Sequence, residues 1–375
     1  MAQRLALFAG LFYFTGEFLT LKRPLQIVAL LAACTVAYGV SPARANAAGL
    51  VAHGGARQHL AAQAAPERVT KIVTDESGSR VAIPVSVQRI VTLAPNLTET
   101  VYALGMEDKL AADTSYCDVP PAAKDKPHVG GPANPSLEAI VAMHPDLILA
   151  TTMTSRETID ALRHLGLAVY FSDPHTVRAM LASTAKMAEA IGARAKGAEL
   201  VASLQTRIDV LQAKLSERPL EHVLFVVWED PLITIGQNTF IADALRYAGA
   251  ESVIVSSQDW PQVSMEEILR VQPDYIILTP DHAETDNTNQ IAELRARGVW
   301  HELNAVKLGR VALATEEFIR PSPGLVTAIE TLARQLHPEV FGALEAGPAA
   351  KTSAAKASRS NGRASNQEGC SACGL

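Results

Sequence analysis

Short apolar runs alternate with amphipathic segments along the middle of the chain. The compact runs, which predict buried strands, include Ile90–Leu93, Leu147–Ala150 and Val223–Val227. Each run precedes a segment whose apolar residues recur at helical spacing, namely Thr98–Leu104, Glu157–Leu165 and Phe240–Tyr247. Regular alternation of strand and helix is typical of parallel sheets with helices on their faces. The pattern therefore predicts an α/β fold.

One pattern of 14 residues occurs twice. SLEAIVAMHPDLIL begins at Ser136 and SMEEILRVQPDYII begins at Ser264, an offset of 128 residues. In both copies a serine that can cap a helix precedes an apolar helix face, a Pro-Asp turn and a buried strand. The repetition predicts two related α/β sandwich lobes, each with a parallel sheet.

The segment between the two copies is predicted to form one uninterrupted helix, 194–217. Its apolar residues recur every three or four positions, at Leu200, Leu204, Ile208, Leu211 and Leu215. At about 1.5 Å per residue the helix would span roughly 35 Å. We therefore expect a long rigid helix to join the lobes, with a ligand cleft between them at the carboxyl ends of the strands.

Six regions are expected along the chain: a signal peptide, a flexible linker, an N-terminal lobe, the linking helix, a C-terminal lobe and a disordered tail. Their ranges are 1–47, 48–67, 68–193, 194–217, 218–340 and 341–375. The runs 69–73 and 81–83 predict a hairpin that opens the first lobe. The tail is rich in Ala, Ser, Gly and Lys without an apolar period, which is typical of disorder.

The N-terminal region indicates export. Lys22 and Arg23 precede an apolar run, and Ala45-Asn46-Ala47 supplies the small residues of a signal-peptidase site. A membrane anchor is the alternative, but the run is short for one. Leu31-Ala32-Ala33-Cys34 resembles a lipobox, so acylation of Cys34 is a second processing route. It ranks below cleavage after Ala47, because the apolar run continues past Cys34. A mis-assigned start codon would explain the extra apolar stretch 1–21.

Charge and aromatic content narrow the function. Residues 48–345 carry 25 basic and 37 acidic side chains, which disfavours a nucleic-acid partner. Six of the 19 aromatic residues precede residue 40, and several of the others follow predicted strands. Aromatic side chains in such loops suit a bulky, partly planar ligand.

No catalytic or metal-binding motif is present in the sequence. Nucleotide-binding loops, a Gly-x-Ser-x-Gly elbow and a His-Glu-x-x-His helix are all missing, so we expect no enzymatic activity, cofactor or resident metal. Cys117 stands alone. Cys370 and Cys373 form one Cys-x-x-Cys pair in the tail, and their role stays open; an exported thiol or metal-handling protein is the corresponding alternative.

The loops after the predicted strands supply the ligand candidates. They are Tyr116, Trp228, Trp260, Glu316, Phe318 and Arg320. Three of them also have a structural explanation: Trp228 could cap a sheet, Tyr116 could close the Asp118–Pro121 turn, and Arg320 could be a cap before Pro321. Trp260, which precedes Pro261, is the strongest candidate.

Glu138 and Glu266 occupy the same position in the two repeats, two residues after the capping serine. A carboxylate in the first turn of a helix complements the helix dipole by about 0.3–1 kcal/mol, which is a sufficient structural reason for either residue. Their recurrence also places one acidic side chain on each lobe, where a two-fold-symmetric partner with matching arginines could bind both.

From about Arg68 to His337 the chain resembles the substrate-binding proteins of ABC importers of the helical-backbone class. The resemblance rests on QRIVTLAPNLTE at 88–99, SYCDVPP at 115–121, the duplicated glutamate segments and WPQVS at 260–264. It implies a periplasmic, monomeric protein that delivers its ligand to a permease dimer with an attached ATPase. The family serves vitamin B12, ferric siderophores and haem.

Within that family the chain is most similar to members that bind cobalamin. The resemblance implies that Tyr116, Trp260 and Arg320 contact the ligand and that Glu138 and Glu266 dock onto the permease. A tryptophan that those members have before the first docking segment is replaced here by the sequence GGPAN at 130–134, and Glu316 replaces an aspartate. Cobalamin is the first expectation, and haem or a ferric siderophore is the alternative.

Overall fold

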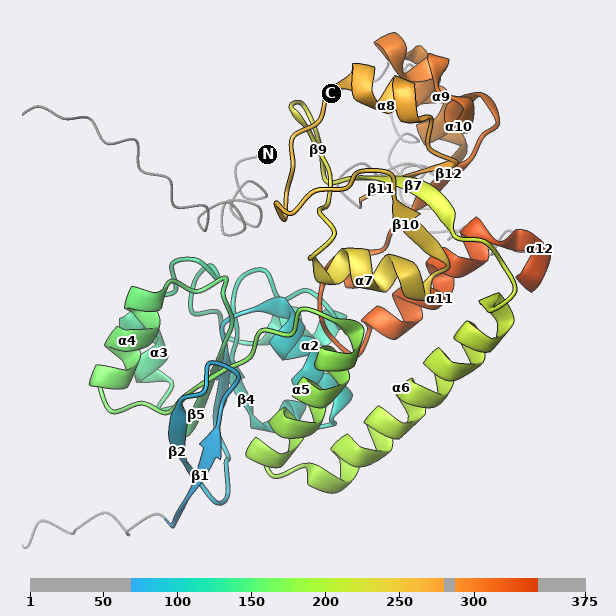
Figure 1. The fold of residues 1–375 in the computed structure, drawn as a ribbon. Coiled ribbons are helices and arrows are strands. Elements are labelled where there is room, and N and C mark those ends of the chain that lie inside the picture. The colour runs from blue at the N-terminus through green and yellow to red at the C-terminus, as the bar shows by residue number, and fades with distance from the viewer. Residues whose placement is uncertain (1–68, 280–286, 343–375) are drawn as a thin grey trace, which may run out of the picture.

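The computed structural model describes residues 69–279 and 287–342, which form two lobes beside one long helix (Figure 1). The N-terminal sheet is parallel, with strand order β4-β3-β5-β6. Its strands are β3 (Ile90–Thr92), β4 (Leu110–Ala112), β5 (Leu147–Ala150) and β6 (Val169–Phe171). The C-terminal sheet is also parallel, with order β10-β7-β11-β12. Its strands are β7 (Glu221–Val226), β10 (Ala250–Ser252), β11 (Tyr275–Leu278) and β12 (Val311–Leu313).

The two sheets have the same strand order when their strands are counted within each lobe, as the sequence repeat predicts. The two copies of the repeat also share local backbone features. His144 and Gln272, equivalent residues of the repeat, both adopt positive φ, at 47° and 48°. Asp146 and Asp274 each accept a backbone N–H from the start of the neighbouring strand, Asp146 from Arg89 at 3.0 Å and Asp274 from His222 at 3.0 Å. The predicted α/β fold of two related lobes is confirmed.

Each sheet is covered on both faces. Successive residues of a strand point to opposite faces, and here they enter different hydrophobic cores. In the N-terminal lobe Ile90 packs on one face with Leu97, while Val91 packs on the other with Ile140. The helices of this lobe are α2 (Pro95–Ala103), α3 (Leu137–Ala142), α4 (Arg156–His164) and α5 (Val177–Ala190). Those of the C-terminal lobe are α7 (Phe240–Tyr247), α8 (Met265–Val271), α9 (Asn287–Ala296), α10 (Asn304–Lys307), α11 (Leu325–Leu336) and α12 (Pro338–Phe341).

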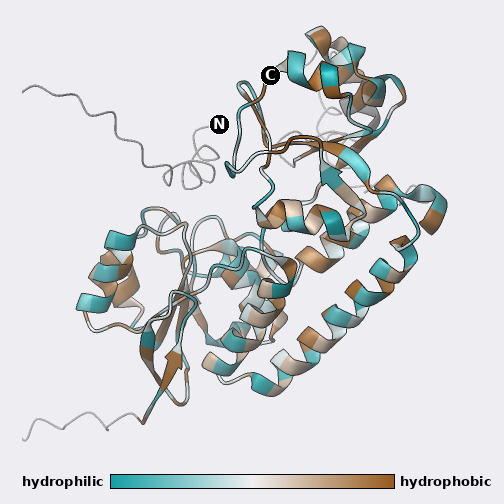
Figure 2. Cartoon of the chain, in the orientation of Figure 1, coloured by the Kyte–Doolittle hydropathy of each residue, from teal (hydrophilic) through white to brown (hydrophobic). Residues whose placement is uncertain are grey.

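Helix α6 (Arg194–Leu215) joins the lobes where the apolar spacing predicted a helix. Figure 2 shows hydrophobic and hydrophilic residues alternating along it, as expected for a helix with one buried face. Near its start a side chain on Gly197 would lie 2.2 Å from the Cβ of Ala188 in α5, so only glycine permits this close helix contact. Further along, Arg207 donates to both oxygens of Glu330 in α11, at 3.0 and 2.7 Å. The helix is therefore fixed to both lobes.

The predicted opening hairpin is present as β1 (Thr70–Thr74) and β2 (Arg80–Pro84). Its turn lies against the end of β6, where the Glu76 amide donates to the Phe171 carbonyl at 3.0 Å. Within the described ranges no helix is both long and apolar enough to cross a membrane. The predicted signal peptide, the linker 48–67, and the tail beyond residue 342 with Cys370 and Cys373 lie outside those ranges.

Candidate ligand site at the junction of the lobes

Loops from the carboxyl ends of both sheets meet at Arg320. This residue follows the short helix η5 (Glu316–Ile319), which comes after β12 of the C-terminal sheet. Its partners in the other lobe are Glu99 of α2, which follows β3, and Asp118, which follows β4. The carboxyl edge of a parallel sheet is where ligands of α/β proteins bind, and here one side chain connects two such edges.

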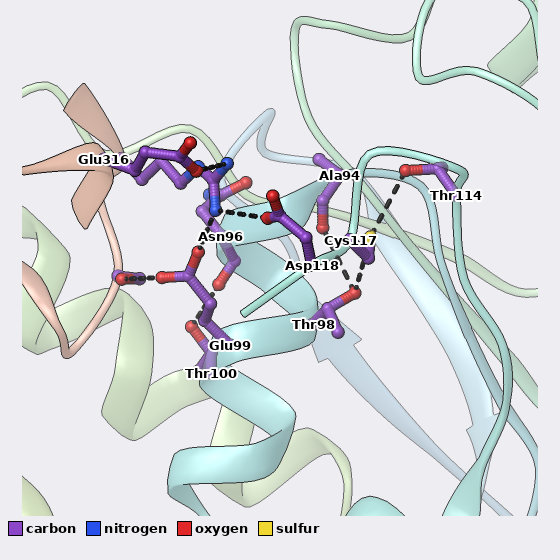
Figure 3. Close-up of polar contacts among 11 residues, drawn as sticks. Ala94, Asn96, Thr98, Glu99, Thr100, Thr114, Cys117, Asp118 and Glu316 are labelled. Carbon is purple, nitrogen blue, oxygen red and sulfur yellow. Dashed lines mark hydrogen bonds and ion pairs between the residues drawn. The ribbon is translucent and has the colours of Figure 1, made fainter. Parts of the chain in front are cut away.

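The guanidinium of Arg320 is surrounded by carboxylates (Figure 3). Its Nη1 donates to Glu99 at 2.9 Å and to Asp118 at 3.2 Å, and its Nη2 donates to Glu316 at 2.6 Å. Ser322 donates its hydroxyl to the second oxygen of Glu99 at 2.5 Å. Three carboxylates, one guanidinium and one hydroxyl therefore form a single network across the junction.

The inner part of this network is buried and the outer part is exposed. The side chains of Arg320 and Glu99 are 10% and 6% exposed, whereas those of Asp118 and Glu316 are 38% and 40% exposed. Burial raises the pKa of Glu99 above its ordinary value, although Arg320 and Ser322 oppose that rise. Burial lowers the pKa of Arg320, but the neighbouring carboxylates outweigh it and the guanidinium stays charged.

Two of the candidate aromatic residues lie on one face of a small ribbon in the C-terminal lobe. Strand β8 (Trp228–Glu229) pairs with β9 (Leu232–Ile233), and Ile233 bridges to Gln262. Residues opposite one another, and residues two apart along a strand, point to the same face. Trp228 and Trp260 accordingly pack, each half-buried, against the same core as Ile233, while Leu232 belongs to the core on the other face.

Gly236 holds the loop that carries Trp260. Its amide donates to the Asp259 carbonyl at 2.8 Å, and the next amide, of Gln237, donates to the Ser256 carbonyl at 3.0 Å. A Cβ at position 236 would lie 1.8 Å from the Gln258 carbonyl oxygen, so no residue other than glycine fits. The sequence reasoning missed Gly236, because a single glycine in a loop gives no sign of what packs against it.

Tyr116 belongs to the other lobe, two residues before Asp118. It is half-buried, and a Cβ on Gly131 would lie 3.6 Å from its ring, so the ring extends beside the 130–134 segment. Tyr116 is thus brought to the junction by the same loop that supplies Asp118.

Phe318 differs from the other candidates because it has no exposed surface. It is 0% exposed, and its ring stacks on Phe225 of β7 with centroids 6.0 Å apart. A side chain in that position stabilises the lobe and anchors η5, so Phe318 has a packing role here and offers no surface to a ligand. Its placement in a loop after a strand was the signal for the ligand prediction, and that signal does not report which way a ring points.

Glu138 and Glu266 are exposed on separate lobes. Each lies in the first turn of its helix, after a serine whose hydroxyl accepts the amide of the third helical residue, Ala139 at 3.2 Å and Glu267 at 3.1 Å. This geometry gives both glutamates the expected interaction with the helix dipole. It also leaves both carboxylates accessible to a partner, so the docking role stays a prediction.

Cys117 lies beside the junction, but its thiol is not exposed to solvent. The thiol is buried and accepts from the hydroxyl of Thr98 at 3.1 Å, with the Thr114 hydroxyl at 3.2 Å (Figure 3). Burial raises the pKa of the thiol, which disfavours the reactive thiolate. In the part of the chain that the structure describes, no group of three or more His, Cys, Asp and Glu residues is placed to hold a metal ion.

Glu99 and Ser322 were not recognised in the sequence as junction residues. Glu99 was part of a family-like motif without an assigned role, and Ser322 is a small polar residue between prolines. One signal was available, because Glu99 is the one charged residue of its helix and a carboxylate needs a partner if it is buried. The partner, 221 positions away, could not be named without the fold.

The two lobes have equivalent parallel sheets, one long helix joins them, and they meet at the carboxyl ends of their strands. This architecture is that of the two-lobed binding proteins with a helical backbone. A model of the family described as periplasmic binding protein matches residues 90–317, and the chain belongs to that family. The resemblance to substrate-binding proteins of ABC importers is thereby confirmed.

Three relatives illustrate the family. The chain is 30% identical over 278 residues to an uncharacterized ABC transporter substrate-binding lipoprotein of Bacillus subtilis (YvrC), covering 72% of this chain and 86% of the relative. The structure of the periplasmic vitamin B12 binding protein of Vibrio cholerae is similar at 25% identity and a TM-score of 0.59, covering 69% of this chain and all of that one. A periplasmic heme-binding protein, BhuT, in complex with two hemes is similar at 25% identity and a TM-score of 0.62, covering 68% and 99%.

Proposed function

We propose that this chain is the extracytoplasmic substrate-binding protein of an ABC importer and that it binds cobalamin or a related corrinoid between its lobes. The observation that carries the proposal is the presence, in both lobes, of half-buried aromatic rings in the segments that follow the carboxyl ends of the strands. Tyr116 comes from the N-terminal lobe, and Trp228 and Trp260 come from one face of the C-terminal lobe. Flat rings supply area and stacking for a large planar chelate at little entropic cost.

The relatives support the metal-chelate class. A vitamin B12 binding protein and a heme-binding protein are similar to this chain over almost their whole lengths. Haem or a ferric siderophore is therefore the second candidate, and it would occupy the same junction. A corrinoid is preferred because the partly exposed side chains of the junction network, Asp118 and Glu316, are carboxylates, which accept hydrogen bonds from amides.

The experiment is a titration of the purified protein with cyanocobalamin, followed by calorimetry and by the visible spectrum of the corrinoid. We expect a one-to-one complex at micromolar concentration or below. If cyanocobalamin does not bind at about 10 µM while haemin or a ferric siderophore does, the corrinoid assignment is wrong and the alternative holds.

Delivery to the membrane would use Glu138 and Glu266. Both are exposed, one on each lobe, at equivalent positions of the repeat. A permease dimer with one basic site on each subunit would engage both, and the ATPase attached to it would drive release of the ligand. The protein itself performs no covalent step in this scheme.

Export would use the signal peptide 1–47, with cleavage after Ala47 and a soluble periplasmic product. Acylation at Cys34 is the alternative, and it is supported by the presence of a lipoprotein among the relatives. Mass spectrometry of the mature N-terminus distinguishes the two, because cleavage leaves Ala48 first and acylation leaves a lipid-modified Cys34.

A further inference from the structure

The charges at the lobe junction are unbalanced. One guanidinium, that of Arg320, faces the carboxylates of Glu99, Asp118 and Glu316. Even with Glu99 protonated, two carboxylates remain for one guanidinium, and with Glu99 ionised there are three. Among the described residues that form this network the negative groups are therefore in excess in either state.

Arg320 is not arranged to receive an anionic group of a ligand. Both terminal nitrogens already donate to carboxylates, at distances of 2.6–3.2 Å. Its remaining nitrogen, Nε, is buried without a hydrogen-bond partner in the protein. Asp118 and Glu316 both lie within 2.6–3.2 Å of the guanidinium, so an anionic group of a ligand that approached Arg320 would be repelled by both carboxylates.

The most exposed side chains of this network are those of Asp118 and Glu316, at 38% and 40%, whereas the side chain of Arg320 is 10% exposed. Asp118 shares its loop with Tyr116, and Glu316 opens η5, whose Ile319 packs on the same core as Trp228. Asp118 therefore lies in the same loop as one candidate aromatic residue, and Glu316 lies in the same lobe as the two tryptophans. Ionised carboxylates accept hydrogen bonds and donate none, so they favour N–H and O–H donors and repel anions.

We propose that Asp118 and Glu316 determine the charge of the ligand, selecting a neutral or cationic chelate with amide or other donor groups on its rim over an anionic one. Arg320 is in this view a positioning residue, which holds the two carboxylates in place and ties them to Glu99 of the other lobe. The inference rests on the proposed function, since it assumes that a chelate binds at the junction. It favours a corrinoid with amide side chains over haem, which carries two carboxylates.

The test compares neutral and anionic chelates, and the closest comparison is between cyanocobalamin and derivatives of it that differ at one rim group. The probes are cyanocobalamin, its monocarboxylic acids, in which one rim amide is replaced by a carboxylate, and haemin. Calorimetric affinities are measured for the wild type, for Asp118→Asn with Glu316→Gln, and for each single variant. The amides keep an accepting oxygen and the shape of the side chain, and both sites are partly exposed. Thermal melting shows that each variant is folded.

For the wild type we expect at least about tenfold weaker binding of one or more monocarboxylic acids, and of haemin, than of cyanocobalamin. In the double variant the ratio of the affinity for cyanocobalamin to the affinity for an anionic probe should decrease by a factor of about three or more. The decrease should come mainly from tighter binding of the anionic probes. The matched control is Glu199→Gln, on the exposed surface of α6, which removes one negative charge far from the junction and should keep the wild-type ratio.

Wild-type protein that binds haemin or every monocarboxylic acid as tightly as cyanocobalamin would overturn the inference. So would an unchanged ratio in the double variant, or an equal narrowing in Glu199→Gln, which would indicate only a long-range effect of net charge. In each of these cases chelate binding itself is retained, and the proposed function stands. Failure of the wild type to bind any of the probes overturns the proposed function and the charge selection with it.

Discussion

Glu99 and Arg320 are 221 positions apart in the sequence, and their side chains meet at 2.9 Å across the junction of the lobes. Both residues are buried: counted over the whole residue, Glu99 is 7% exposed and Arg320 is 8% exposed. Desolvation offsets much of the attraction in such a pair, so the pair as a whole adds little stability, but removal of one partner leaves the other buried without its counter-charge. The pair therefore makes each lobe depend on the other.

Arg320→Ala should destabilise the protein because it removes the positive charge beside the buried Glu99 carboxylate. Of the two hydrogen bonds that Glu99 accepts across the junction, the one from Ser322 would remain. The expected loss is about 3–5 kcal/mol in the free energy of unfolding at neutral pH, measured by urea denaturation. The control is Arg194→Ala, whose side chain is 82% exposed and 3.9 Å from Glu189. A loss below ~1 kcal/mol is expected there. Equal losses in the two variants would contradict a special role for the buried pair.

Asp113 should make stability depend on pH. It is fully buried with His128 Nδ1 at 2.7 Å from its carboxylate, and burial raises the pKa of Asp113 from 3.8 to about 6 although His128 lowers it. The folded state thus holds this proton more tightly than the unfolded chain. The contribution of Asp113 to the free energy of unfolding therefore falls as the pH rises from about 4 to about 6, and it stays low above that range.

Asp113→Asn removes this titration. The free energy of unfolding of the variant, minus that of the wild type, should increase between pH 4 and pH 6 and become constant above pH 7. Denaturation at a series of pH values measures the difference directly. A difference that is constant from pH 4 to pH 7 would show that Asp113 ionises in the folded protein as easily as in the unfolded chain.

Gly236→Ala should weaken ligand binding through the loop that carries Trp260. The new Cβ would lie 1.8 Å from the Gln258 carbonyl oxygen, so the 256–260 segment has to move. We expect an affinity for cyanocobalamin at least about tenfold lower by calorimetry, with the hydrogen exchange of the loop accelerated. Ser257→Ala, an exposed substitution in the same loop, should retain the wild-type affinity. Unchanged affinity in Gly236→Ala would remove Trp260 from the ligand site.

Glu138→Ala combined with Glu266→Ala should abolish ligand uptake in cells while leaving the affinity of the purified protein unchanged. The two carboxylates are exposed, and they lie on helices that do not carry the junction residues. The control is Glu157→Ala, an exposed first-turn glutamate of α4 with the same relation to a helix dipole. It should transport normally. Parallel loss of affinity and uptake in the double variant would argue against separate docking and ligand surfaces.

The sequence could predict the fold because the fold is specified locally and then repeated. Compact apolar runs, helical spacing and capping serines located strands such as β5 and helices such as α6 within a few residues. The two copies of the repeat then implied two lobes of the same strand order. Each of these inferences depends on residues that are close together in the chain, where periodicity and capping act.

The site was only partly accessible to the same reasoning. Trp228 and Trp260 were identified as candidates, but that they share one face of a ribbon depends on the pairing of Ile233 with Gln262. Phe318 had the same sequence context as they did, and the structure buries it against Phe225. A loop position predicts that a side chain is near the end of a strand. Whether the side chain faces solvent or the core is decided by what packs against it.

By itself, then, the sequence determined two α/β lobes, a linking helix and a set of aromatic and acidic residues in loops. The tertiary structure alone decided that Arg320 is enclosed by Glu99, Asp118 and Glu316, and that its lobe is tied to the other through Glu99. The physical reason is that burial and Coulomb interaction depend on distance in space. Glu99 and Arg320 become neighbours only when the two lobes have folded and met.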